Sequence, residues 1–431
     1  MQVIENMKVK EKLYIEKLDN GLSVMIIPKK GIQKKYVIWG TNYGSNDSKF
    51  VVPGDTEITE VPDGVAHFLE HKMFEQKNGK NSLDVLTELG ADANAYTTND
   101  HTAYLFSCTD NFYEALDELM DYVQNPYFTD ENVEKEKGII SQEIMMYDDY
   151  PDWKVYMNAV QAMYSDFPIR IDTAGTVETI SHIDKEVLYK CYNTFYNPSN
   201  MAMVVCGDFE PEAMLAEIKR RLLDIKASGE IKRIYPEEPE GIVKDYVEQD
   251  MEVSRPLYAI GIKDKPFEDF KNFSKDDIVK KHIAIEILLN LIFGESSDLY
   301  KKLYNDGVIM SNPSMDYEFS RGYAFVVLLS GQSKDPRKVY EEFKKAVNDI
   351  KEKGIVEEDF NRIKKTIYGD YIKEYNDVTD IARMFLSDYF KGINSFDYIE
   401  QIGSVNKDYT EQILNEVFAE NKMVLSVINS K

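Results

Sequence analysis

The sequence has few cysteines and no long apolar run, and each shortage excludes a class of protein. Its 3 cysteines, Cys108, Cys191 and Cys206, have no CxxC spacing, so we expect buried, reduced thiols rather than a disulfide framework or a cysteine zinc cluster. No apolar stretch reaches the roughly 18 residues of a membrane-spanning helix. The amino terminus also lacks a basic region followed by an apolar one, so we predict no signal peptide and a cytoplasmic protein.

Basic residues are also scarce relative to acidic ones. The chain has 51 Lys and Arg against 76 Asp and Glu, a net charge of −25. This balance argues against nucleic acid or an anionic membrane as a partner, since both need a basic surface, and it is compatible with basic peptides. The length of 431 residues predicts two to four domains or sub-domains, and 43% hydrophobic residues with 29% charged residues are typical of a folded, soluble protein.

Only 5 histidines are present, and two of them fall in one pentapeptide with a carboxylate, His67 to His71 around Glu70. Asp63 is expected to cap a helix over residues 63–74, on which these three side chains share one face. Two imidazoles four residues apart can bind one zinc ion, and the carboxylate between them can accept a proton from an attacking water. The alternative is that two histidines lie on one helix by chance.

A second helix, expected over residues 129–146, carries two further carboxylates, Glu136 and Glu143. Seven residues apart, they lie on nearly the same face, next to Ile139 and Ile140. A carboxylate on the core side of a helix needs a partner, and a metal ion is one such partner. Solvated surface glutamates are the alternative.

Two hairpins are expected, at residues 13–28 with an Asn20-Gly21 turn, and at residues 94–107 with a turn at Asn99-Asp100. The first strand of the second hairpin contains Asn94. If that strand lies at a sheet edge, an extended peptide can pair with it as an added strand. A buried strand pair is the alternative.

The second part of the chain repeats features of the first. Residues 112–116 resemble 339–343, residues 131–140 resemble 358–367 at the same shift, and residues 201–205 resemble 423–427, although amphipathic helices of similar composition also look alike. We predict an α+β fold of two tandem homologous halves, each a mostly antiparallel sheet flanked by helices. Residues 1–228 form the zinc-bearing half, 229–246 a linker and 247–431 a half without metal, because its helix at 280–293 has only His282 and Glu286.

These motifs resemble those of the pitrilysin/insulinase family of zinc metallopeptidases, the inverzincins, whose HxxEH motif reverses the commoner HExxH. The resemblance covers essentially the whole chain. It rests on the run from Gly64 to His71, on Asn94-Ala95-x-Thr97 with Thr102-x-Tyr104, and on Glu136-x6-Glu143.

The resemblance implies a zinc-dependent endopeptidase that cleaves extended peptides, with one zinc ion per chain. It makes His67, His71 and Glu143 the zinc ligands and Glu70 the general base. Glu136 would orient a ligand histidine or complete the local charge. The substrate backbone would be held by Asn94, Ala95, Tyr96 and Thr97. The remaining histidines, His101, His182 and His282, are expected to serve turns, caps or packing.

One departure from the family pattern predicts a partner subunit. Active members usually supply an arginine and a following tyrosine from the second half, where this chain has Tyr304 and then Ile309 or Met310. Arg321 and Tyr323, expected on one strand and pointing the same way, are possible substitutes. The chain is similar to the zinc-bearing subunit of bacterial heterodimeric processing-peptidase-like enzymes, so a heterodimer with a paralogue that carries the Arg/Tyr pair is expected. A homodimeric peptidase and a non-catalytic peptide-binding scaffold are the alternatives.

Overall fold

The computed structural model describes residues 1–267 and 274–431, which group into two compact units. Unit 1 comprises Met1–Ile144, Ile171–Ile234 and Ile372–Ser395, and unit 2 takes its residues from Met145–Arg170, Tyr235–Tyr371 and Phe396–Lys431. Each unit is a sheet flanked by helices, which confirms the predicted α+β class. Each unit also contains a segment from the other half of the sequence, and the contiguous division at 229–246 stays a prediction about the duplication.

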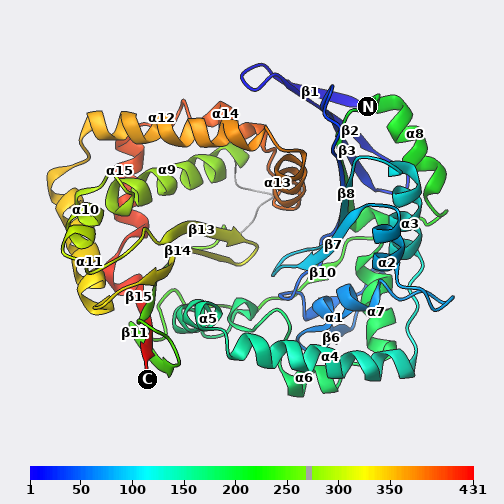
Figure 1. The fold of residues 1–431 in the computed structure, drawn as a ribbon, viewed down its shortest axis with the longest axis horizontal. Helices are drawn as coiled ribbons and strands as arrows, with labels where there is room; N and C mark the ends of the chain where they lie inside the picture. The colour runs from blue at the N-terminus through cyan, green and yellow to red at the C-terminus, as the bar shows by residue number, and fades with distance from the viewer. Residues whose placement is uncertain (268–273) are drawn as a thin grey trace. The chain divides into compact units, whose positions relative to one another are not determined.

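Unit 1 is built on a 7-stranded sheet of order β1-β2-β3-β9-β4-β8-β7 (Figure 1). Only β3 and β9 pair in parallel; the other neighbours are antiparallel. Both predicted hairpins are confirmed, as β2 with β3 and β7 with β8. The strands are β1 (Gln2–Asn6), β2 (Glu11–Lys17), β3 (Ser23–Pro28), β4 (Lys35–Thr41), β7 (Asp92–Thr97), β8 (Thr102–Cys108) and β9 (Met201–Gly207), and a smaller sheet contains β5 (Lys49–Val51), β6 (Ile58–Glu60) and β10 (Lys232–Arg233).

The two faces of this sheet are covered by different parts of the chain. Val37 and Trp39 of β4 face the main core, which also contains apolar residues of several of the unit's helices. These helices are α1 (Val65–Lys72), α2 (Ser82–Glu88), α3 (Phe112–Gln124), α4 (Asp130–Asp148), α6 (Val177–Ser181), α7 (Lys185–Phe195) and α8 (Pro211–Arg221).

The opposite face is covered by α13 (Val378–Phe390), which lies against β4 and β9 (Figure 1). Gly40 of β4 makes this close approach possible, because a Cβ there would lie 2.9 Å from atoms of both Leu386 and Phe390. A helix from late in the sequence therefore completes the core of unit 1.

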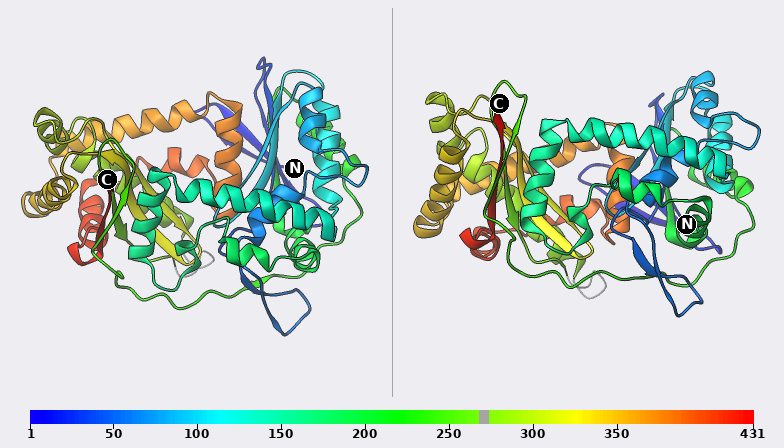
Figure 2. Two further views of the ribbon diagram at one scale, coloured as in Figure 1. Left: turned by 60° about the horizontal axis from the view of Figure 1, so that its bottom comes forward. Right: turned by 90° about the horizontal axis from the view of Figure 1, so that it is seen from below.

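Unit 2 has the reciprocal arrangement. Its 5-stranded sheet, of order β11-β15-β12-β14-β13, packs against α5 (Pro151–Met163) (Figure 2). Val155 and Ala159 of α5 form one buried apolar cluster with residues of the sheet, including Ala259 and Ile428. The strands are β11 (Tyr246–Met251), β12 (Leu257–Lys263), β13 (Ser314–Ser320), β14 (Tyr323–Gln332) and β15 (Met423–Ser430). The remaining helices are α9 (Lys275–Phe293), α10 (Asp298–Asn305), α11 (Pro336–Lys353), α12 (Glu357–Glu374), α14 (Phe396–Gln401) and α15 (Lys407–Val417).

The prediction that Arg321 and Tyr323 lie on one strand is wrong. Arg321 and Gly322 form the turn between β13 and β14, and Gly322 has φ +84°, a conformation that glycine adopts readily. Tyr323 begins β14 and is buried with its ring near those of Phe167 and Phe325. Its side chain therefore belongs to the core of unit 2.

The structure also bears on the expectations drawn from the few cysteines and from the lack of a long apolar run. The three cysteines are buried and free. Among the described helices, none combines the length and apolar character needed to cross a membrane.

Candidate metal centre

The HxxEH motif lies on α1, as predicted, but the start of the helix differs from expectation. Gly64, not Asp63, is the N-cap residue, and α1 has no side-chain cap. Gly64 has φ +94°, and a Cβ there would lie 2.5 Å from the carbonyl oxygen of Ala174. The loop before α6 therefore lies too close for a side chain at this position, and glycine is required by both space and backbone conformation.

The buried face of α1 determines where the motif points. Phe68 and Leu69 are fully buried in the core of unit 1. His67, Glu70 and His71 therefore lie on the side of the helix toward α4 and β7.

His67, His71 and Glu143 come together as a group that can hold a metal ion. Nε2 of His67 is 3.7 Å from Oε1 of Glu143, and Nε2 of His71 is 3.4 Å from Oε2 of the same carboxylate. One ligand atom from each residue lies within 4.8 Å of the others. Glu143 is on α4, which spans Asp130–Asp148, so the predicted second helix is confirmed and supplies the third donor.

This spacing fits a tetrahedral zinc ion. Two atoms that are each about 2.0–2.1 Å from zinc lie about 3.3 Å apart at a tetrahedral angle. The two nitrogen–oxygen distances, 3.7 Å from His67 to Oε1 and 3.4 Å from His71 to Oε2, are near that value. They run to different oxygens of Glu143, so a small shift of this carboxylate would let one oxygen serve as the third ligand. Two imidazoles and one carboxylate are also a donor set that zinc favours, and they leave a fourth position open.

Glu136 lies behind the group and contacts α1 through both of its oxygens. Its Oε1 is 3.0 Å from Nδ1 of His71, and its Oε2 accepts a hydrogen bond of 3.3 Å from Nζ of Lys72. A carboxylate at Nδ1 of a histidine directs the lone pair of the other ring nitrogen outward, here toward Glu143. For His67, by contrast, Nδ1 is buried and has no hydrogen-bond partner among the described residues.

Burial controls the charge states of the group. Burial, with the charge of His71, lowers the pKa of His67 to about 3, so its imidazole is neutral, the form that binds metal. Burial also raises the pKa values of Glu70 and Glu143. For His71, burial acts downward, but the hydrogen bond to Glu136 and the nearby carboxylates outweigh it and raise the pKa. Burial thus disfavours the ionised forms of Glu70 and Glu143, and a divalent cation beside them would favour those forms.

Glu70 is held by a residue of the edge strand. Oγ1 of Thr97 donates to Oε2 of Glu70 at 2.6 Å. Ala93 and Ala95 pack against the core on the same face of β7, so the two-residue period of a strand also turns Thr97 toward α1. The sequence assigned Thr97 to substrate binding, and the structure adds this direct contact with Glu70.

The strand that carries Asn94 lies at the sheet edge, the first of the two alternatives. Among the described strands, β7 pairs with β8 alone. Its other side presents backbone groups to which an extended peptide can pair. Along this strand Asn94 is exposed, whereas Ala95, Tyr96 and Thr97 are partly buried.

The contact of Lys72 with Glu136 was not predicted from the sequence. Its position four residues after Phe68 and three after Leu69 was a signal that it shares their buried face.

The other histidines have structural surroundings, as expected. His101 contacts Asp100 and Thr98 in the turn after β7, His182 is the C-cap of α6, and Nδ1 of His282 is 2.9 Å from the hydroxyl of Tyr398.

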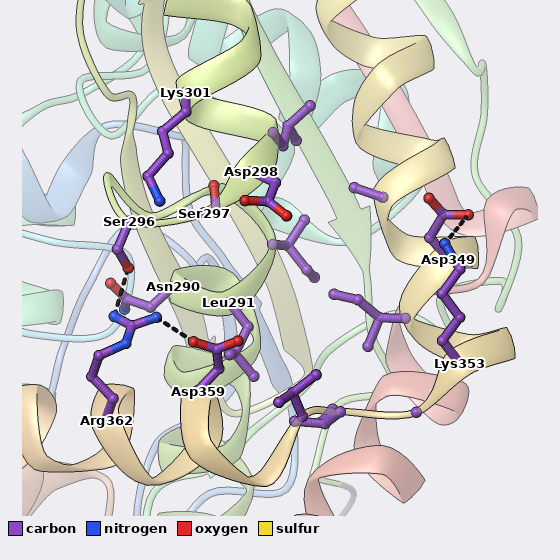
Figure 3. A pocket seen from close by; sticks show the side chains of 17 residues that line it. Asn290, Leu291, Ser296, Ser297, Asp298, Lys301, Asp349, Lys353, Asp359 and Arg362 are labelled. Carbon is purple, nitrogen blue, oxygen red and sulfur yellow. Dashed lines mark hydrogen bonds and ion pairs between the residues drawn. The ribbon is translucent and has the colours of Figure 1, made fainter.

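A separate cavity of about 640 Å³ lies within unit 2, lined by residues of α9, α10, α11 and α12 (Figure 3). Arg362 donates to Ser296 and to Asp359 there, each at 2.8 Å. The described residues that line it include no histidine and no cysteine. The chemistry suggested by the motifs therefore belongs to unit 1.

Comparisons with known proteins agree with this assignment. Residues 54–177 match the family model "Insulinase (Peptidase family M16)", and residues 182–367 match "Peptidase M16 inactive domain". A protein of Bacillus subtilis described as the uncharacterized zinc protease YmfH is 38% identical over 431 residues, 99% of each chain. The β subunit of the mitochondrial-processing peptidase of Dictyostelium discoideum is 25% identical over 276 residues, 61% of this chain and 55% of that one. The crystal structure of a putative M16-like peptidase from Alicyclobacillus acidocaldarius has a TM-score of 0.93 at 33% identity, covering 99% of this chain and 100% of that one.

Proposed function

Because the chain belongs to the insulinase family of peptidases, family M16, we propose that it is a zinc-dependent endopeptidase that cleaves extended peptides. One zinc ion per chain is held by His67, His71 and Glu143. The observation that carries the proposal is the approach of both Nε2 atoms to one carboxylate, at 3.7 and 3.4 Å. Its relative YmfH is described as a zinc protease. The expected compartment, the cytoplasm, stays a prediction.

The residues around the centre have distinct roles in this proposal. A zinc ion in the centre would supply a Lewis acid that polarises a peptide carbonyl and makes water more acidic. Glu70 accepts the proton of the attacking water and passes it to the leaving amide nitrogen. Thr97 fixes the carboxylate of Glu70 through its 2.6 Å hydrogen bond. Glu136 keeps His71 in the tautomer whose Nε2 is free to bind.

The substrate is held along β7. An extended peptide pairs with the free edge of this strand through main-chain hydrogen bonds, beside Asn94, Ala95, Tyr96 and Thr97. Because Thr97 belongs to the edge strand and also donates a hydrogen bond to Glu70, it links the position of the substrate to that of the base. This arrangement favours unfolded or extended peptides over folded proteins.

The isolated chain is proposed to need a partner. The position of the family's arginine is occupied by Tyr304, which is 53% exposed, and Tyr323 is buried in unit 2. Loss of one oxyanion donor costs about 2.7–4 kcal/mol in other enzymes, so the chain alone should hydrolyse peptides poorly. A paralogue that supplies the Arg/Tyr pair completes the site in a heterodimer. The similarity to a subunit of the mitochondrial-processing peptidase supports this arrangement.

Two experiments test these proposals. Glu70→Gln should retain zinc and lose hydrolysis, because the amide cannot accept the proton; unchanged cleavage would refute the role of Glu70. For the partner, peptide cleavage is measured with the chain alone and with a co-expressed paralogue. Full activity of the chain alone, unaffected by the paralogue, would show that no partner is needed.

A further inference from the structure

Lys72 has an unusual environment for a lysine. Its side chain is fully buried, and it is among the largest fully buried side chains of the chain. Lysine is almost never fully buried unless it is paired, because transfer of an ammonium group out of water is costly. Nζ of Lys72 has two carboxylate partners, Oε1 of Glu75 at 2.9 Å and Oε2 of Glu136 at 3.3 Å.

Lys72 and His71 are consecutive residues that share the carboxylate of Glu136. His71 takes Oε1 and Lys72 takes Oε2, so the carboxylate is held at both oxygens. Glu136 itself is only 8% exposed, which leaves little room for water to replace either partner. If the contact to Lys72 were absent, the carboxylate could turn away from Nδ1 of His71.

Lys72 is also distinctive in its charge. Within residues 1–267 and 274–431, it is the only lysine or arginine in ion-pair contact with Glu70, Glu136 or Glu143. Its position directs that contact to Glu136 and not to Glu143. The Lys72 contact therefore distinguishes the carboxylate that lies behind His71 from the carboxylate proposed to bind zinc.

We propose that Lys72 is a positioning residue of the zinc centre, which holds Glu136 behind His71 so that Nε2 of His71 stays turned toward Glu143. The inference rests on the proposed function and deepens it. Lys72 acts through Glu136 and touches neither the substrate nor the metal. Outer partners of metal ligands typically contribute about 10–100-fold to metal affinity, and we expect an effect of that size.

The test is a double-mutant cycle read out as zinc affinity. Lys72→Met, Glu136→Gln and the double variant are made in the full chain, and zinc binding is measured by competition with a chromogenic chelator. Each single variant should bind zinc about 10–100-fold more weakly than wild type. The double variant should be close to the weaker single variant, because both changes remove the same support.

A matched control separates positioning from general destabilisation. Lys29 is another lysine of unit 1 that is paired with a glutamate, Glu11, and its side chain is 14% exposed. Lys29→Met should lower the thermal midpoint of the metal-free protein without changing its zinc affinity. If Lys72→Met does not fold, Lys72→Gln replaces it, because the shorter, uncharged amide stays polar but removes the ion pair with Glu136. Weaker zinc binding by this variant is expected.

The outcomes are distinguishable. Unchanged zinc affinity in the folded Lys72 variant, or independent effects of Lys72→Met and Glu136→Gln that multiply in the double variant, would overturn the inference alone. Equal losses of zinc affinity in the Lys29 and Lys72 variants would also overturn it. A wild-type chain that does not bind zinc would overturn the proposed function together with the inference.

Discussion

Replacing Thr97 by valine should impair catalysis most strongly at low pH. Valine has nearly the shape of threonine, so the change removes the hydroxyl and leaves the packing of β7 almost intact. The lost hydrogen bond is short, 2.6 Å from Oγ1 of Thr97 to Oε2 of Glu70, and its acceptor is a carboxylate. Such charge-assisted bonds contribute about 1.5–3 kcal/mol, roughly a 10–100-fold change in an equilibrium constant.

The sign follows from which form of Glu70 the bond stabilises. Burial raises the pKa of Glu70, and the hydrogen bond from Thr97 opposes that rise by favouring the ionised form. Loss of the bond should therefore raise the pKa further. A general base must be ionised to accept a proton, so the acidic limb of the pH profile of kcat/KM should move to higher pH. At pH values well above this limb, the variant should approach wild-type activity.

The assay is peptide hydrolysis across pH by the zinc-loaded chain, together with the partner subunit if activity requires it. Thr97→Ser is the matched control, because it keeps the hydroxyl, and its profile should resemble that of wild type. An unchanged acidic limb in Thr97→Val would refute the reasoning. A loss of kcat/KM that is equal at every pH would instead assign Thr97 to substrate binding alone.

Three further predictions concern stability. Leu386→Ala should lower the free energy of unfolding, measured in urea, by about 2–5 kcal/mol, because Leu386 is fully buried in the core of unit 1. The control is Leu223→Ala, which should change it by less than about 0.5 kcal/mol because Leu223 is 44% exposed. Equal effects of the two substitutions would contradict the packing of α13. Gly64→Ala should lower the thermal midpoint more than Gly79→Ala does. Both glycines have positive φ, but only at Gly64 would the new Cβ lie 2.5 Å from a carbonyl oxygen. A larger loss in Gly79→Ala than in Gly64→Ala would contradict this close contact. Burial tends to raise the pKa of Glu238. Its carboxylate forms an ion pair with Lys263 and accepts backbone hydrogen bonds from residues 165–167, and these interactions outweigh burial and lower the pKa. The stability lost in Glu238→Gln should therefore be largest near neutral pH and disappear as pH falls through that lowered pKa, and a loss independent of pH would exclude an ionic contribution.

Local patterns in the sequence predicted most of the candidate site. The spacing of His67, Glu70 and His71 requires only one turn of helix, and the seven-residue spacing of Glu136 and Glu143 requires only two. Both helices are present. The strand of Asn94 was predicted with its hairpin, and the sheet order decided that it lies at the edge. Such features depend on residues close together in the chain, where helical and strand periods apply directly.

The long-range features could not be read in the same way. An amphipathic pattern shows which face of α5 or α13 is apolar, but not which of two similar sheets that face will cover. The pairing of Lys72 with Glu136 joins residues of two helices that are 64 positions apart in the sequence. Arg321 and Tyr323 are expected from the sequence to lie on one strand, yet Gly322 allows the tight turn that separates β13 from β14. Each of these outcomes depended on contacts made only in the folded chain.

The most direct test of the zinc centre is anomalous scattering from crystals of the chain grown with zinc, recorded on both sides of the zinc absorption edge. The account predicts one strong peak per chain in unit 1, bonded to Nε2 of His67, Nε2 of His71 and a carboxylate oxygen of Glu143. A zinc peak bonded to other side chains, or no peak within reach of these three residues, would contradict it.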